Sequence, residues 1–151
     1  MLKENEIAMA IVDAAYQIHR ALGPGLLESA YEAILVHELG KRGLAVSVQV
    51  PVPVVYESVR LDAGFRADLI VEDLVIVELK SLEKVVPVHK KQLMTYLKLS
   101  GKRLGLLVNF GEELIKDGIN PDRKRLAGIT PINPTKSGFA QNTQSAQSKT
   151  L

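Results

Sequence analysis

The sequence predicts one α/β domain whose elements follow the order α-α-β-β-β-α-β. Two observations support this fold class. Apolar residues recur at helical spacing through residues 4–41, and from residue 46 they switch to the strict alternation that is typical of strands. Further apolar strands at residues 74–79 and 104–110 are separated by one more helical segment, an alternation typical of α/β domains.

Two helices are expected at the N-terminus. Ile7, Ile11 and Ile18 share one helix face and predict an amphipathic helix over residues 4–21. The sequence LGPG at residues 22–25 ends it, because consecutive glycine and proline cannot continue the helical hydrogen bonds. A second helix is expected over residues 26–41, with Gly43 in a C-cap position.

Three strands should follow. Valines alternate with polar residues and prolines over residues 46–54, and the prolines Pro51 and Pro53 place this strand at a sheet edge. After a turn at residues 57–58, the second strand covers residues 59–71, with Gly64 at a bulge or a close approach. The third strand, residues 74–79, is apolar on both faces and should be central.

Proline and glycine mark the two ends of the next helix. Pro87 opens a helix that Gly101 ends, and a buried strand over residues 104–110 precedes a short helix near residues 112–116. From residue 131 the composition shifts to Pro, Thr, Ser, Asn and Gln. We therefore expect a folded domain over residues 1–130 and a disordered tail over residues 131–151.

Composition limits the chemistry. The chain of 151 residues has no cysteine, which excludes disulfides and zinc–thiolate sites, and its three histidines lack metal-ligand spacing. A metal here would need oxygen ligands, as Mg²⁺, Mn²⁺ or Ca²⁺ do. No apolar stretch suits a bilayer or a signal peptide, so we expect a cytoplasmic protein with no membrane partner. The net charge of +2 permits a nucleic-acid partner without arguing for one.

Charged residues interrupt two of the apolar strands. Glu78 and Lys80 lie on one face of the third strand, and Asp68 interrupts the second strand ten residues earlier. A plain two-residue turn at residues 72–73 would pair Asp68 with Val77 and point the two carboxylates apart. A shared site therefore requires an odd-length loop or a bulge, which we predict. Two adjacent carboxylates would suit Mg²⁺, which takes few protein ligands and keeps its waters for a phosphate.

Several short motifs together resemble the PD-(D/E)XK nuclease superfamily. Asp68 followed by ELK at residues 78–80 resembles its D…(E/D)xK signature, with Ala67 standing where the superfamily's name has Pro. GPGLLE at residues 23–28 and QLMTY at residues 92–96 are similar to the G-x-x-x-x-E and Q-x-x-x-Y motifs of its RecB-like branch. GLLESAY at residues 25–31 and NFG at residues 109–111 resemble the GxxExxY family. The resemblance covers residues 7–119.

This resemblance implies a restriction-endonuclease-like core, with a mixed central β-sheet flanked by helices. It implies a metal-dependent nuclease that hydrolyses phosphodiester bonds, those of DNA, with Mg²⁺ or Mn²⁺ as cofactor. The implied metal ligands are Glu28, Asp68, Glu78 and the backbone carbonyl of Leu79. The implied catalytic residues are Asp68, Glu78 and Lys80, and those implied to position substrate are Tyr31, His89, Gln92 and Tyr96.

Structural interpretations stay open beside these roles. Glu28 would be favoured in the first turn of a helix by the helix dipole alone, and Tyr31 has the spacing of a core aromatic residue. The alternative to a nuclease is a catalytically inactive nuclease-fold protein that binds nucleic acid or a protein partner. A homodimer is also open, because the chain is short and carries no second domain for specificity.

Overall fold

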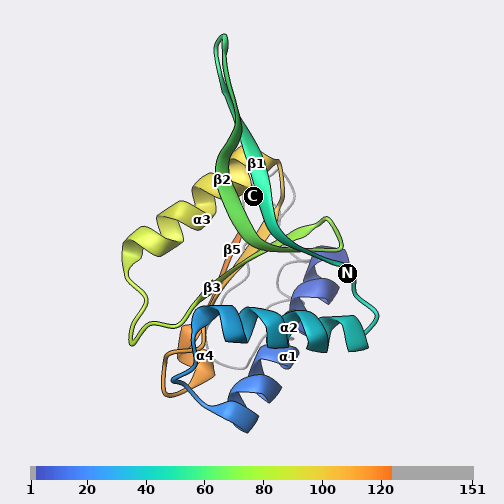
Figure 1. The fold of residues 1–151 in the computed structure, drawn as a ribbon, viewed down its shortest axis with the longest axis vertical. Coiled ribbons are helices and arrows are strands. Elements are labelled where there is room, and N and C mark those ends of the chain that lie inside the picture. The colour runs from blue at the N-terminus through green and yellow to red at the C-terminus, as the bar shows by residue number, and fades with distance from the viewer. Residues whose placement is uncertain (1–2, 124–151) are drawn as a thin grey trace, which may run out of the picture.

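The computed structural model describes residues 3–123 (Figure 1). The elements in chain order are α1 (Lys3–Leu22), α2 (Glu28–Lys41), β1 (Val46–Tyr56), β2 (Val59–Val71), β3 (Val75–Lys80), α3 (Pro87–Ser100), β4 (Leu104–Asn109), α4 (Ile115–Gly118) and β5 (Ile119–Arg123). The expected tail over residues 131–151, and the domain boundary at residue 130, lie outside the described residues.

The strands form one mixed five-stranded sheet in the order β1-β2-β3-β4-β5. β3 is central and runs parallel to β4, whereas the pairs β1–β2, β2–β3 and β4–β5 are antiparallel. The predicted fold class, a mixed sheet with flanking helices, is confirmed. So is the prediction that residues 46–54 form an edge strand, since β1 pairs only with β2 in the described sheet.

The predicted order of elements lacked the last strand at the C-terminal end. The short helix α4 begins at Ile115, three residues later than expected, and the strand β5 was not foreseen. β5 reads INPDR, which has neither alternating nor continuous apolar residues, so local pattern gave no strand signal. It pairs with β4, whose buried backbone groups on that edge need hydrogen-bond partners.

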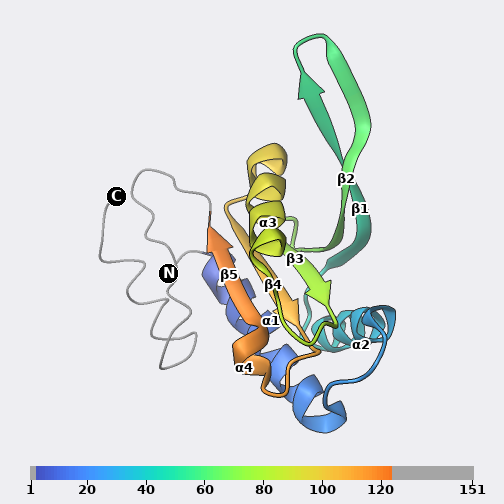
Figure 2. The ribbon, with the colours of Figure 1, turned by 90° about the vertical axis from the view of Figure 1, so that its left-hand side faces the viewer.

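Helices cover both faces of the sheet (Figure 2). The odd-numbered residues of β3, such as Val75 and Val77, belong to the larger core that α1 and α2 contribute to. Ile76, on the opposite face, packs in a smaller core with Leu93 and Leu97 of α3. The alternation of side chains along β3 therefore separates two cores, and both of its faces are buried as predicted.

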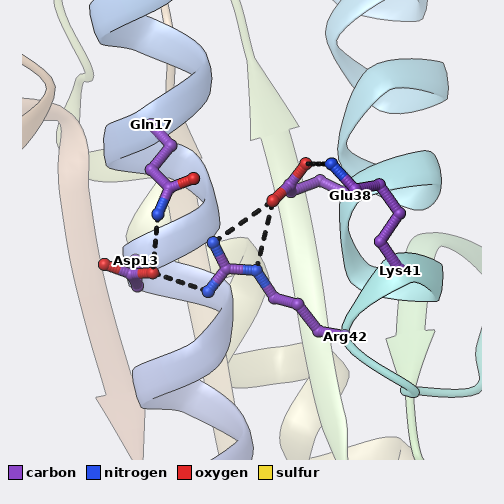
Figure 3. Close-up of polar contacts among 5 residues, drawn as sticks. All are labelled: Asp13, Gln17, Glu38, Lys41 and Arg42. Atoms are coloured by element: carbon purple, nitrogen blue, oxygen red, sulfur yellow. Dashed lines mark hydrogen bonds and ion pairs between the residues drawn. The ribbon is translucent and has the colours of Figure 1, made fainter.

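α1 and α2 are joined by a polar cluster as well as by the core (Figure 3). Arg42, at the C-cap of α2, donates to Asp13 of α1 at 2.6 Å and to Glu38 at 3.3 Å. Because Asp13 is 59 % exposed, the contribution of this pair to stability is small, roughly 0.2–1 kcal/mol. The pair links the end of α2 to the middle of α1.

α2 begins at Glu28, two residues later than the expected start at Leu26. The N–H of Leu26 donates to the hydroxyl of Tyr31 at 3.2 Å, and this bond holds the preceding loop outside the helix. Gly23 and Gly25 in that loop have φ of +69° and +116°, values that side chains disfavour. The glycines thus allow a sharp entry that places Glu28 at the first helical position.

The outer halves of β1 and β2 form a two-stranded ribbon that stands clear of the body of the molecule (Figures 1 and 2). Its tip turns at Glu57 and Ser58, as predicted. Gly64 is a close-approach point, also as predicted, because an added Cβ would lie 1.8 Å from Cγ2 of Val54. A register shift between Val52 and Val54 accommodates Pro53 in the ribbon.

Candidate active site

The β2–β3 hairpin has the odd-length connection that a shared carboxylate site requires. Val71 pairs with Val75 and Leu69 with Val77, so three residues, 72–74, form the loop. The same register sets Asp68 opposite Glu78. The prediction of an odd loop is confirmed, and its cause is a turn in which Glu72 and Asp73 both have left-handed φ, of 53° and 56°.

Asp68 and Glu78 interlock at the point where β2 and β3 stop pairing. The backbone N–H of Asp68 donates to Oε1 of Glu78 at 3.1 Å, and the N–H of Leu79 donates to Oδ2 of Asp68 at 2.8 Å. Side-chain oxygens thus replace the carbonyls that a continued ladder would offer. From this point toward its N-terminal end, β2 diverges from β3 into the ribbon (Figure 2). Asp68 and Glu78 directly follow the last pair of the ladder, Leu69–Val77.

Glu78 is the most perturbed ionisable group of the site. Its side chain is buried, only 8 % of the residue being exposed. Burial, followed by the negative charge of Asp68, raises the pKa of Glu78 from 4.5 to about 8. Near neutral pH such a group is mostly protonated, and a cation beside it would favour its ionised form. Lys80, half-buried on the same strand, acts in this direction.

Glu28 faces the same charges from α2. Burial and the charge of Asp68 raise the pKa of Glu28, while the charge of Lys80 lowers it. The fold therefore brings Glu28, Asp68, Glu78 and Lys80, from three elements, into one electrostatic neighbourhood. Among residues 3–123, however, no three acidic or histidine side chains already surround a common metal position.

α3 brings Tyr96 to the carboxylates. Burial and then the charges of Glu78 and Asp68 raise the pKa of the Tyr96 hydroxyl. Its ring stacks on Phe65 of β2, with centroids 4.0 Å apart and an interplanar angle of 2°. Gln92, one turn earlier, is exposed, and no hydrogen bond in the described part of the chain links it to the carboxylate pair. Only Tyr96 of the two is thus held against the site.

His89 and Tyr31 are committed to backbone contacts. Nδ1 of His89 accepts from the N–H of Val86 at 3.3 Å, and the His89 N–H donates to the Val86 carbonyl at 3.1 Å, which caps the start of α3. Tyr31 is fully buried and stacks on Phe110. Its hydroxyl donates to the carbonyl of Gly23 at 2.5 Å. Both residues therefore hold the ends of helices in place.

Asn109 fixes the segment that follows β3. Its buried side chain accepts from the N–H of Leu82 at 2.8 Å and donates to the Leu82 carbonyl at 2.9 Å. Gly111 lies against the same backbone, since an added Cβ would be 2.3 Å from the Leu82 carbonyl oxygen. Sequence reasoning noted this NFG run as a family likeness and missed its clamping role, which depends on a contact between segments 27 residues apart.

A hollow of about 340 Å³ lies between the chain segments next to Glu28 and Lys80. It lies between the loop before α2 and the segment after β3, and its lining includes Gly25, Leu26, Ser81 and Gly111. The Ser81 hydroxyl donates to the Leu26 carbonyl at 2.8 Å across this hollow. The loop that leads to Glu28 and the segment that follows Lys80 are thus joined beside the carboxylates.

A polar residue of β1, Gln49, also reaches the carboxylates and was missed by sequence reasoning. Its Nε2 lies 3.4 Å from Oδ1 of Asp68 and 2.8 Å from Oε2 of Glu32. Within the alternating pattern of β1 it looked like any outward-facing polar residue. No signal in the sequence distinguished it.

The fold and these carboxylates define the class of protein. A mixed sheet whose central hairpin carries interlocked Asp and Glu, with Lys two residues later, is a restriction-endonuclease-like arrangement. The profile of the PD-(D/E)XK nuclease superfamily matches residues 5–121, and the chain belongs to that superfamily. No curated protein and no solved structure was found to match the chain. Within residues 3–123, no helix has the length and hydropathy needed to cross a membrane.

Proposed function

We propose that the protein hydrolyses phosphodiester bonds of DNA with the help of Mg²⁺ or Mn²⁺. The observation that carries the proposal is the interlocked pair of Asp68 and Glu78 at the branch between β2 and β3. The pKa of about 8 means that the protein alone poorly stabilises the ionised form of this buried carboxyl group, which faces a second carboxylate. Such pairs are typical of sites that bind a divalent cation.

The donor set suits a hard cation. Asp68 and Glu78 each accept from a backbone N–H through one oxygen, which fixes their orientation. The second oxygen of Asp68 has only the long contact of 3.4 Å with Nε2 of Gln49 among the described residues, and it would face a ligand. Glu28 supplies a third carboxylate from α2, and the carbonyl of Leu79 is the fourth proposed donor. The metal, when bound, would polarise the phosphate and activate a water for attack. All of these donors are oxygens, as Mg²⁺ and Mn²⁺ prefer.

The cationic and aromatic residues would act on the substrate. Lys80 extends from the end of β3 beside Glu78 and would stabilise the charge that develops on the phosphate and orient the attacking water. Tyr96, held by Phe65, would hydrogen-bond a phosphate oxygen from α3. Gln92 is exposed on the same helix face and would contact the strand. We assign Tyr31 and His89 to holding the helix ends, in view of their backbone contacts.

A basic surface supports nucleic acid as the substrate. Basic side chains occur on α3, the helix that carries Tyr96, and in the segments before and after it: Lys84, His89, Lys90, Lys91, Lys98, Lys102 and Arg103. Lys102 is paired with Asp73 at 2.9 Å and Arg103 with Glu4 at 3.8 Å, whereas Lys84, Lys90, Lys91 and Lys98 make no ion pair within residues 3–123 and could neutralise phosphates. The hollow beside Leu26 and Ser81 offers room for a nucleotide that flanks the reacting phosphate.

The finer placement is also a proposal. The motif at residues 25–31, with Glu28 at the helix start and Tyr31 bonded to the glycine loop, supports membership of the GxxExxY group within the RecB-like branch. We propose that the catalytic domain ends near residue 130 and that the enzyme acts in the cytoplasm, alone, as a homodimer or with a protein partner.

The experiment that tests this function varies the metal and the nucleic acid. Purified protein is incubated with labelled single- and double-stranded DNA and RNA, with Mg²⁺, Mn²⁺ or EDTA, and Asp68→Asn serves as the control. Asparagine keeps an acceptor for the Leu79 N–H, so the variant should fold. We expect metal-dependent cleavage of DNA by the wild type and a loss of at least about 100-fold in the variant. DNA binding without turnover in any metal would instead favour the inactive alternative.

A further inference from the structure

Gln49 has a backbone conformation that its sequence position does not explain. It lies in the middle of β1, between the pairs Val48–Leu69 and Val50–Ala67, so it faces Asp68 across the strands. Its φ is +51°, in the left-handed region. This conformation is unfavourable for a residue with a side chain, and strained residues of this kind concentrate at functional sites.

At Gln49, the side chains of β1 and β2 change the core toward which they point. On β2, Leu69 packs in the larger core with α1 and α2, whereas Ala67, two residues away, packs in the smaller core beneath α3. Val46 and Val50 of β1 divide between the two cores in the same way. Residues two apart on a regular strand share a face, so the ribbon turns over at Gln49 and Asp68.

This turn explains the backbone of Gln49 but not its side chain. Glycine or asparagine would adopt the same φ at lower cost. The amide of Gln49 has two N–H groups, and its Nε2 lies 2.8 Å from Glu32 and 3.4 Å from Asp68. Glu32 lies on α2 one turn after Glu28. The amide therefore bridges the helix that carries one proposed ligand to the strand that carries another.

We propose that Gln49 is a positioning residue, whose amide bridge between Glu32 and Asp68 holds the carboxylates of Glu28 and Asp68 at the separation that one divalent cation requires. The inference rests on the proposed function. Without the bridge, Glu32 on α2 and Asp68 on β2 would lose the donor that lies between them. Residues that orient metal ligands typically contribute 10- to 100-fold to metal affinity or activity.

The test uses two variants that relieve the backbone strain. Gln49→Gly removes the amide, and Gln49→Asn keeps an amide and tolerates the left-handed region but is one methylene shorter. The matched control is Glu57→Gly, because Glu57 also has φ of +51° but lies at the tip of the ribbon. Melting of the metal-free proteins, Mn²⁺ affinity from calorimetry or electron paramagnetic resonance, and kcat and KM for DNA are measured for all four proteins.

We expect both Gln49 variants to melt, without metal, at or above the wild-type temperature, since strain is removed. Their Mn²⁺ affinity should fall about 10-fold or more, and kcat should fall with little change in KM. Glu57→Gly should gain similar stability and keep wild-type affinity and kcat. Wild-type Mn²⁺ affinity in both Gln49 variants would overturn the inference, and so would a loss of metal-free stability with unchanged affinity.

The same data separate this inference from the proposed function. If the wild type binds Mn²⁺ but cleaves nothing, the proposed activity fails, and the affinities of the Gln49 variants still decide the role of the bridge. If the wild type binds no Mn²⁺ at millimolar concentration, the carboxylates do not form a metal site, and both proposals are wrong.

Discussion

Replacement of Lys80 by alanine is expected to lower DNA cleavage by about 100-fold or more while the domain stays folded. The reason is the isolation of the ammonium group. Among residues 3–123, Lys80 makes no side-chain hydrogen bond and no ion pair, so its removal breaks neither kind of contact. What is lost is a positive charge close to Glu78 and Glu28, where the phosphate would lie.

The measurement compares kcat and melting temperature for the wild type, Lys80→Ala and Lys41→Ala. Lys41 is a suitable control because it is exposed at the far end of α2 and, within residues 3–123, forms an ion pair only with Glu38, at 3.4 Å. Circular dichroism spectra of all three should coincide, and Lys41→Ala should retain activity. Full activity in Lys80→Ala would remove Lys80 from the mechanism and favour a charge network with no catalytic role.

Replacement of Glu78 by glutamine is expected to stabilise the metal-free protein at alkaline pH and to abolish cleavage. The pKa of Glu78 in the fold is about 8, above its ordinary value of 4.5. Its contribution to stability is therefore fully present below about pH 4.5 and is lost as the pH rises through 8. Above pH 8 the wild type holds a buried negative charge beside Asp68, which glutamine removes.

The effect should be on the order of 2–4 kcal/mol of unfolding free energy at pH 9, and small at pH 5. Glutamine keeps an oxygen for the N–H of Asp68, so the interlocked geometry survives. Urea denaturation in EDTA at the two pH values measures the difference, with Glu57→Gln at the exposed ribbon tip as the control. If Glu78→Gln instead destabilises the protein at pH 9, Glu78 is a structural residue.

Local pattern and chain parity predicted the part of the site that lies on one hairpin. Alternation along a strand places Glu78 and Lys80 together, and the need for a shared face required the odd connection that residues 72–74 provide. The same reasoning identified the edge strand β1 and the close approach at Gly64, because proline and glycine have specific backbone requirements. Glu28 was predicted as a metal ligand from the family resemblance alone, because no sequence pattern places it near the hairpin.

The contacts between distant segments could not be predicted in this way. Gln49 meets Glu32 and Asp68 only because α2 and β1 pack beside β2, and its left-handed φ leaves no trace in the alternation of β1. Asn109 clamps Leu82 across 27 residues of sequence. β5 was missed because its pairing with β4, rather than its composition, makes it a strand.

The central claim is that Asp68 and Glu78 bind a divalent cation, and thermal melts test it most directly. Wild type and Asp68→Ala are each melted in EDTA, Mg²⁺ and Mn²⁺. At a metal concentration about 100 times Kd the wild type should gain about 2.7 kcal/mol, or roughly 5–10 °C, whereas the variant should not respond. If neither protein changes its melting temperature between EDTA and millimolar metal, the charged residues form a structural network and the claim is wrong.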